Sequence, residues 1–377
     1  MKKELSDTKY RMSKIIEAIP ELRDKEQREA LYSDLEVLKE TNYEGYRLAI
    51  ETWKRIVLMA CQKGLLAANA QGQPAFTCID SSKIAAQFEC EGNCPAGMQA
   101  VIGELAKGGE IIQYGRFMGG SGLSGWARWF IGGLPLASLI LRSAGVDRPS
   151  WYVVMPAVES IGSRVLKLIK RRVHFPVTDC LMTVEQFRQE FSSAIDGSDR
   201  QAMGAIDAEV VLRWLLDQCK VSVLNQAAGV EAGSIDAGVI KFVAPDAVRA
   251  APVTQTDRDV LKLVGTFNRV KAQVDALQTR SSELDRLVRE AVTRKQKAVA
   301  LHYLKLRKHV DTSVLPPRLS AYHTLSHIVD QVQASASDAE VLSACEVGAN
   351  ALRALSKVHG LTAERVDDIL DDLEEAL

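Results

Sequence analysis

The stretch from residue 260 to residue 291 restricts the fold more than any other part of the chain. Its apolar residues recur in alternating steps of three and four, and only Ser281 interrupts the pattern. This spacing places them on one face of a helix of roughly thirty residues. A second helical stretch, KAVALHYLKLRKHV, follows after Gln296, so the pair predicts a helical hairpin. The apolar stripe is formed by Val260, Leu263, Phe267, Val270, Val274, Leu277, Leu284, Val288 and Ala291.

Charge is divided sharply across this C-terminal part, although the whole chain carries a net charge of only -1. Residues 258–308 hold 13 Lys and Arg against 5 Asp and Glu, whereas residues 311–377 hold 4 against 12. The basic part would be attracted to anionic lipid by about 1 kcal/mol per well-placed cation, and the acidic part could fold back over it. The alternative interpretation is that both are solvated faces of a soluble helical bundle.

The N-terminal part repeats one order of elements. Residues 46–118 predict a helix, a short extended piece, two further helices and a strand, and residues 151–242 predict the same order again. This order is typical of a winged helix, so we expect two in tandem, the alternative being one irregular α+β domain. The expected domains are a helical arm (1–41), a first winged helix (42–118), a hydrophobic loop (119–148), a second winged helix (149–243), a linker (244–255) and a helical core (256–377).

The helices that would enter DNA in these domains are not basic. The first, PAGMQAVIGELAK, carries one Glu and one Lys, and the second, DAEVVLRWLLDQCK, carries more acidic than basic residues. Binding to phosphates requires Lys and Arg, so we expect protein or membrane contact and no nucleic acid. A winged-helix regulator that binds nucleic acid remains the alternative function.

The sequence GGSGLSGWARWFIGGLPLASLILRSAG, residues 119–145, contains the pattern G-x-G-x-x-G. A dinucleotide site would need a long helix after these glycines, but Gly132, Gly133 and Pro135 end any helix within two turns. A membrane span needs about twenty apolar residues, and only thirteen residues separate Arg128 from Arg142. The pattern therefore predicts an element that lies in a membrane interface. Packing between the two winged helices is the alternative.

Tryptophans prefer the headgroup boundary of a bilayer, and arginines can bind anionic lipid while apolar side chains insert. The expected lipid-binding residues are Trp126, Trp129, Phe130, Leu134, Leu136, Leu139 and Ile140, with Arg128 and Arg142 beside them.

No catalytic or metal site is expected. The N-terminus lacks a secretory signal, so the seven cysteines are expected as free thiols in a reducing compartment. Cys78, Cys90 and Cys94 lack a second pair or a nearby histidine, and His323 and His327 lack the glutamate of a zinc protease. We find no nucleophile motif and no acid-base pair, so we expect no enzyme and no cofactor. An oxidoreductase that uses the glycines is the weakest alternative.

The order of these parts resembles the charged multivesicular body proteins of the ESCRT-III machinery. The most specific pieces are the basic stretch RKQKAVALHYLKLRK, the stretch VLSACEVGANALRALSK and the position of GWARWFIGGLPLASLILR after the first winged helix. The resemblance implies a mainly α protein, in which tandem winged-helix (α+β) domains precede an ESCRT-III helical hairpin or bundle.

The resemblance also implies a scaffold on the cytoplasmic side of the endoplasmic reticulum, the nuclear envelope and endosomes. Its expected partners are a lipid membrane, other ESCRT-III subunits, an adaptor protein of the inner nuclear membrane and further copies of itself in a polymer. Its functions would be nuclear envelope sealing, membrane remodelling and vacuolar or endosomal sorting.

Residue by residue, the resemblance makes the tryptophan-containing strip the membrane-binding loop. The implied basic hairpin surface consists of Arg294, Lys295, Lys297, Lys305, Arg307 and Lys308. The implied polymer seam consists of Val260, Leu263, Phe267, Val270, Val274, Leu277 and Leu284.

Two features depart from the family pattern. Pro316 and Pro317 fall where the family extends its second helix, and proline lacks the N–H that a helix interior needs. We therefore expect a kink, or a helix that restarts at Pro317. The sequence also ends at DDLEEAL, without the tail in which relatives carry the motif that recruits a disassembling ATPase.

Overall fold

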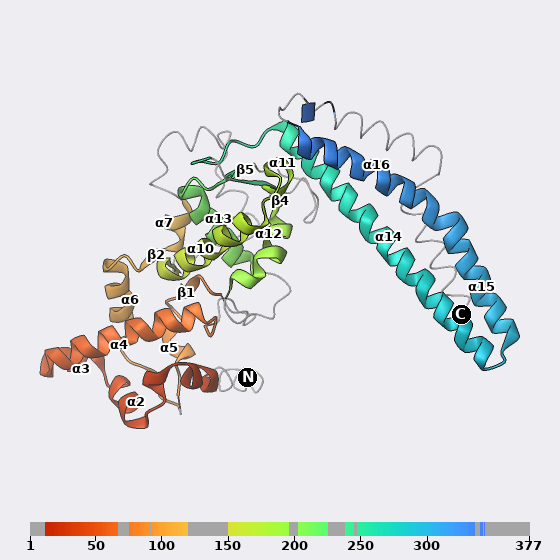
Figure 1. The fold of residues 1–377 in the computed structure, drawn as a ribbon. Coiled ribbons are helices and arrows are strands. Elements are labelled where there is room, and N and C mark those ends of the chain that lie inside the picture. The colour runs from red at the N-terminus through yellow and green to blue at the C-terminus, as the bar shows by residue number, and fades with distance from the viewer. Residues whose placement is uncertain are drawn as a thin grey trace. The chain divides into compact units, whose positions relative to one another are not determined.

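The structure, a computed structural model, describes residues 12–66, 75–90, 92–119, 150–195, 203–224, 238–244, 247–335, 340–341 and 343. The chain forms two compact units. The first contains Met1–Val173 and Met182–Pro252, and the second contains His174–Leu181 and Val253–Leu377. Both are mainly helical (Figure 1).

The N-terminal helices belong to the core of the first winged helix. Residues 12–18, η1 (Pro20–Leu22), α2 (Lys25–Leu31) and α3 (Leu35–Thr41) lie against α4 (Tyr43–Gln62). Trp53 of α4 is fully buried, and its Nε1 donates to the carbonyl oxygen of Leu31 at 3.0 Å. These elements are too short to be stable alone, so they bury their apolar faces against α4. The arm expected at 1–41 therefore shares a core with the domain that follows it.

The first sheet is completed by a strand from beyond the hydrophobic loop. β1 (Cys78–Asp80), β2 (Ile111–Gln113) and β3 (Trp151–Val154) form an antiparallel sheet in the order β1-β3-β2. Between β1 and β2 lie α5 (Ile84–Gln87) and α6 (Met98–Lys107). We expected the second winged helix to begin at residue 149, but β3 belongs to the sheet of the first winged helix. We also expected Val153 in a helix, whereas it lies in β3. Aromatic and β-branched residues favour the strand.

The second winged helix follows the expected order. It contains α10 (Met155–Arg172), β4 (Leu181–Thr183), α12 (Val184–Glu190), η2 (Phe191–Ala194), α13 (Ala205–Asp217), β5 (Val221–Leu224) and β6 (Val239–Phe242). The short helix α11 (Pro176–Asp179), between α10 and β4 in the sequence, belongs to the second unit, where it packs on α14 (Gln255–Thr293) and α16 (Leu315–Ala334). The sheet of the second winged helix has the order β4-β6-β5. A capping box joins Thr183 to Gln186 at the start of α12, and the rings of Phe187, Phe191 and Phe242 pack together.

A buried carboxylate joins the two winged helices within the first unit. Asp207, in the first turn of α13, is 1% exposed. Its Oδ1 accepts from the backbone nitrogens of Phe76 and Thr77 at 2.9 and 3.0 Å and from the Thr77 hydroxyl at 2.7 Å. Hydrogen bonds from several donors compensate for the loss of water around a buried carboxylate. The loop before β1 is thereby fixed to α13.

The second unit is the expected helical hairpin. α14 (Gln255–Thr293) begins at a capping box between Thr254 and Asp257 and runs for 39 residues. α15 (Lys297–His309), a π-helical segment (Val310–Val314) and α16 (Leu315–Ala334) return along it (Figure 1). The helical backbone continues without a break from Lys297 to Ala334 through the π-helical segment, so the restart that we expected at Pro317 does not occur. Pro316 and Pro317 lie directly after that segment, in the first turn of α16, where the backbone hydrogen bonds change pattern.

Ser281, the one interruption of the apolar stripe, has a polar partner in the π-helical segment. Its hydroxyl donates to Asp311 Oδ1 at 2.7 Å. Asp311 also lies 3.4 Å from Arg307 Nε, and Arg307 Nη1 donates to Asp285 of α14. The polar position therefore joins the two arms of the hairpin at a fixed register.

We predict that Ser281→Ala lowers the free energy of unfolding of the hairpin by about 1 kcal/mol, because Asp311 loses a hydrogen bond between the arms. Ser282→Ala is the matched control, since Ser282 is exposed and its hydroxyl donates to the carbonyl oxygen of Gln278 in its own helix. Urea unfolding followed by circular dichroism measures both. Equal effects of the two changes would contradict the role given to Ser281.

Close packing of α10 on α13 gives a second prediction. A Cβ added at Gly162 would overlap the ring of Trp214, whereas a Cβ at Gly103 of α6 would meet no heavy atom within 4 Å. Gly162→Ala should therefore destabilise the first unit by about 1–3 kcal/mol. Gly103→Ala should leave it unchanged or stabilise it by about 0.5–1 kcal/mol, as expected inside a helix. Thermal unfolding measures both, and a stable Gly162→Ala variant would count against the described packing.

Candidate functional site

The hydrophobic strip lies outside the described residues, but its two ends do not. α7 (Tyr114–Gly119) leads into the strip from β2, and β3 begins directly after it. The rings of Tyr114 and Trp151 meet edge to face, 6.3 Å apart, in one buried cluster with Phe117 and Met118. The described residues on either side of the strip therefore lie in one buried cluster beside the first sheet. The predicted residues outside the described part are Trp126, Arg128, Trp129, Phe130, Leu134, Leu136, Leu139, Ile140 and Arg142.

The apolar stripe of α14 is covered by the other arm of the hairpin. Val260 is 1% exposed and Leu284 is 2% exposed. Leu263 and Val274 are also buried, and Phe267, Val270 and Leu277 are half-buried. Phe267 stacks on Tyr322 of α16 with ring centres 5.4 Å apart. A second copy of the chain could reach this expected polymer seam only if α15 and α16 moved away.

The expected basic surface divides into one paired cation and five exposed ones. Arg307 makes ion pairs with Asp285 and Asp311, so it joins the two arms. The exposed cations make no ion pair with any residue that the structure describes, and they are Arg294, Lys295, Lys297, Lys305 and Lys308. Arg294 and Lys295 lie in the turn between α14 and α15, and Lys297 is the first residue of α15.

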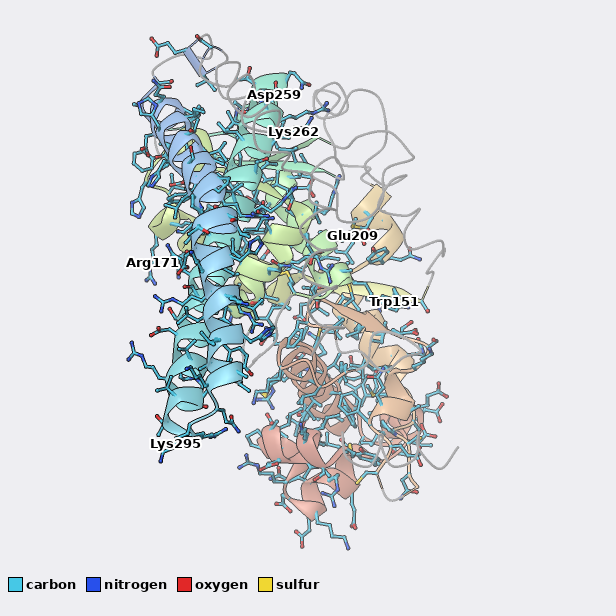
Figure 2. The ribbon with its side chains drawn as sticks, turned by 90° about the vertical axis from the view of Figure 1, so that its right-hand side faces the viewer. Trp151, Arg171, Glu209, Asp259, Lys262 and Lys295 are labelled. Carbon is cyan, nitrogen blue, oxygen red and sulfur yellow. The ribbon has the colours of Figure 1, made fainter. Side chains whose placement is uncertain are left out.

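The turn itself holds Lys295 in a conformation that favours glycine. Its φ is +59°, and the nitrogens of Lys295 and Gln296 donate to the carbonyl oxygens of Val292 and Ala291, each at 2.9 Å. This bonding pattern ends many helices, with glycine most common at the left-handed position. A lysine there costs about 1 kcal/mol relative to glycine. Figure 2 shows Lys295 at the closed end of the hairpin.

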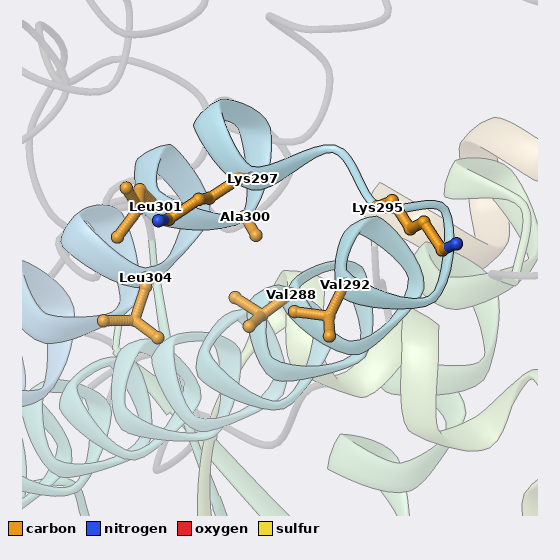
Figure 3. Close-up of a pocket in the computed structure, with 7 residues that line it drawn as sticks. All are labelled: Val288, Val292, Lys295, Lys297, Ala300, Leu301 and Leu304. Carbon is orange, nitrogen blue, oxygen red and sulfur yellow. The ribbon is translucent and has the colours of Figure 1, made fainter.

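Apolar side chains surround this turn and remain in contact with water. Val292 is 62% exposed, Leu301 is 51% exposed and Leu304 is 48% exposed. A cavity of about 280 Å³ lies between α14 and α15, beside Lys295 and Lys297. Figure 3 shows Ala300 and Leu304 facing Val288 and Val292 across it. We call residues 288–304 the hairpin tip. Cations beside exposed apolar side chains are typical of surfaces that bind anionic bilayers.

The helices that would read DNA have little free charge. Glu104 and Lys107 of α6 pair at 2.8 Å. Arg213 of α13 is 3% exposed and lies 3.2 Å from Asp217. Burial raises the pKa of the Asp217 carboxyl, and the nearby Arg213 opposes that rise. The cations of these two helices, Lys107 and Arg213, therefore each pair with an acid of the same helix.

The cysteines and histidines do not converge. Cys78 is buried, Cys94 is exposed, and His323 and His327 are exposed on α16. Burial raises the pKa of the Cys61 thiol well above its usual value, so it stays protonated. Within the described ranges, no group of three or more potential ligands could hold a metal ion. None of the helices described there is long and apolar enough to cross a bilayer.

Comparison with known proteins gives consistent matches. A family model described as the CHMP7 N-terminal winged helix domain matches residues 18–113. Over 366 residues the chain is 24% identical to charged multivesicular body protein 7 of Xenopus tropicalis, covering 94% of this chain and 70% of that protein. The human protein of the same name is 22% identical over 361 residues, covering 93% of this chain and 72% of that protein.

The protein of that name from Dictyostelium discoideum is 30% identical over 138 residues, covering 37% of this chain and 28% of that protein. No solved structure matches the chain. The similarity over nearly the whole length, together with the matching N-terminal domain, confirms the expected resemblance and makes this chain a relative of charged multivesicular body protein 7 with a role of the ESCRT-III type.

Proposed function

We propose that the chain is a peripheral membrane scaffold of the endoplasmic reticulum and inner nuclear membrane, which polymerises and recruits further ESCRT-III subunits. Residues 119–148 and the hairpin tip bind the lipid, and residues 256–377 form the assembling core. The role is structural and uses no cofactor. It serves nuclear envelope sealing, membrane remodelling and sorting at endosomes or vacuoles, with an inner nuclear membrane adaptor as a partner.

The observation that carries this proposal is the composition of the hairpin tip. Lys295 and Lys297 are exposed without ion pairs to described residues, and Val292 and Leu301 are exposed beside them. Contact of these apolar side chains with water is unfavourable. At a bilayer they insert into the membrane while the lysines bind lipid phosphates. Lys295 has the left-handed backbone conformation that glycine adopts at lower cost, and a lysine at this position is consistent with a role in lipid binding.

The ends of the hydrophobic strip support a membrane contact in the first unit. Because α7 and β3 hold residues 119 and 150 at one sheet, the strip between them is an insertion that can be presented without disturbing that sheet. Its tryptophans and flanking arginines match the composition of an interfacial segment.

Assembly requires a change in the hairpin, because the seam on α14 is covered. The π-helical segment before Pro316 is the natural point for this change. A π segment holds the backbone by i→i+5 bonds, and its removal would rotate the following helix. We propose that polymer formation exposes the seam by moving α16 away from α14 at this point.

Flotation of the full chain with vesicles of phosphatidylcholine and phosphatidylserine tests the lipid contact. Lys295→Glu with Lys297→Glu should reduce the bound fraction by about tenfold or more, since each cation contributes about 1 kcal/mol. The control is Lys39→Glu with Arg47→Glu, which has the same net charge and changes two exposed residues of the first unit. Equal losses in the two variants would remove the hairpin tip from the proposal.

Lys295→Gly separates stability from binding. Glycine relieves the left-handed strain, so this variant should be more stable than the parent by about 0.5–1 kcal/mol. Loss of one cation should still weaken vesicle binding by about fivefold. Thermal unfolding and flotation of the same preparation measure both effects. A more stable variant that binds as tightly as the parent would show that the Lys295 charge has no part in binding.

A further inference from the structure

A second cationic surface lies on α10 of the second winged helix. The buried side of this helix includes Ile161, Val165 and Ile169. Lys167, Lys170 and Arg171 have the spacing i, i+3, i+4, so they share one side of the helix, opposite the buried side. All three are exposed, and we call them the α10 cationic face.

These three residues differ from the neighbouring cations of the same helix. Arg172 pairs with Glu190, and Arg164 donates to Ser160. Lys167, Lys170 and Arg171 make no ion pair with any described residue. A helix end is stabilised by cations only within its last turn, and α10 ends at Arg172. Lys167 lies before that turn, so the helix dipole does not account for it.

The connection of α10 to the hydrophobic strip suggests a partner. β3 follows the strip directly, and α10 follows β3 without a linker, because Val154 ends the strand and Met155 begins the helix. Val154 is fully buried and paired in the first sheet, so the junction is stiff. A strand and helix with no residue between them therefore join the proposed lipid-binding strip to three cations that make no ion pair with a described residue.

Nucleic acid fits this face less well. A winged helix reads DNA with its recognition helix, here α13, and Arg213 of that helix is buried and paired with Asp217. The α10 cationic face also includes no aromatic side chain on which a base could stack. A row of lysines and arginines on one side of a helix, with no aromatic residue among them, is suited to the diffuse negative charge of a lipid surface.

We propose that the α10 cationic face is a further contact with an anionic membrane, made by the second winged helix. It rests on the proposed function, since it adds a contact to a membrane-bound scaffold. Two contacts from one stiff unit bind more tightly than either alone, because the second forms at a high effective concentration. They also fix the orientation of that unit on the membrane.

The test uses the full chain and vesicles with and without phosphatidylserine. Lys167→Gln, Lys170→Gln and Arg171→Gln together remove the charge without placing acids at the helix end. This variant should bind anionic vesicles about tenfold or more weakly and should show a weaker dependence on salt. The charge-preserving control, Lys167→Arg with Lys170→Arg, should bind like the parent. Circular dichroism verifies that both variants fold.

Each other outcome overturns the proposal in a recognisable way. Undiminished flotation of the glutamine variant, with binding lost in the Lys295→Glu, Lys297→Glu variant, removes the α10 face and leaves the hairpin tip. Equal losses in the glutamine and arginine variants show that charge is not the cause. Short duplex DNA bound by the parent and lost in the glutamine variant, with vesicle binding intact, assigns the face to nucleic acid. Absence of vesicle binding by the parent overturns the proposed function itself.

Discussion

The apolar stripe of α14 is the constraint on which the hairpin depends. A helix of 39 residues with one apolar face must have that face covered, and burying each large side chain contributes about 2 kcal/mol. α15 and α16 supply the cover, and the Ser281–Asp311 hydrogen bond sets their register. At the closed end the chain has only a short turn with which to reverse direction, so Val292 and Leu301 remain uncovered. The hairpin tip is a consequence of how the stripe is buried.

In the first unit, buried polar and packing contacts fix the elements on either side of the hydrophobic strip. The three hydrogen bonds to Asp207 join the two winged helices, and the close approach of Gly162 to Trp214 packs α10 on α13 within the second. β3, contributed from beyond the hydrophobic strip, completes the first sheet and continues into α10. Both described ends of the strip are thereby packed against this unit.

The sequence predicted the order of helices, the hairpin and the tandem winged helices, because each rests on local periodicity. It did not predict β3, since that strand pairs across residues 120–149 and its pattern alone fits the start of a helix. Asp207 looked like an ordinary acid in a first helical turn, and only tertiary structure brings Thr77 to it. Arg307 was predicted on a free basic surface, but Asp285 and Asp311 pair with it. The interruption at Ser281 was the available signal for that network. The lipid-binding and polymer roles stay predictions.

Hydrogen exchange of the full chain, followed by mass spectrometry with and without anionic vesicles, tests the membrane contact most directly. The first amides of α15, from Lys297 to Val299, lie in the first turn of a helix and lack partners within it, so they exchange readily in the free protein. The account predicts that vesicles slow exchange in residues 119–148 and in this first turn of α15. Binding to vesicles with unchanged exchange in both segments would contradict it.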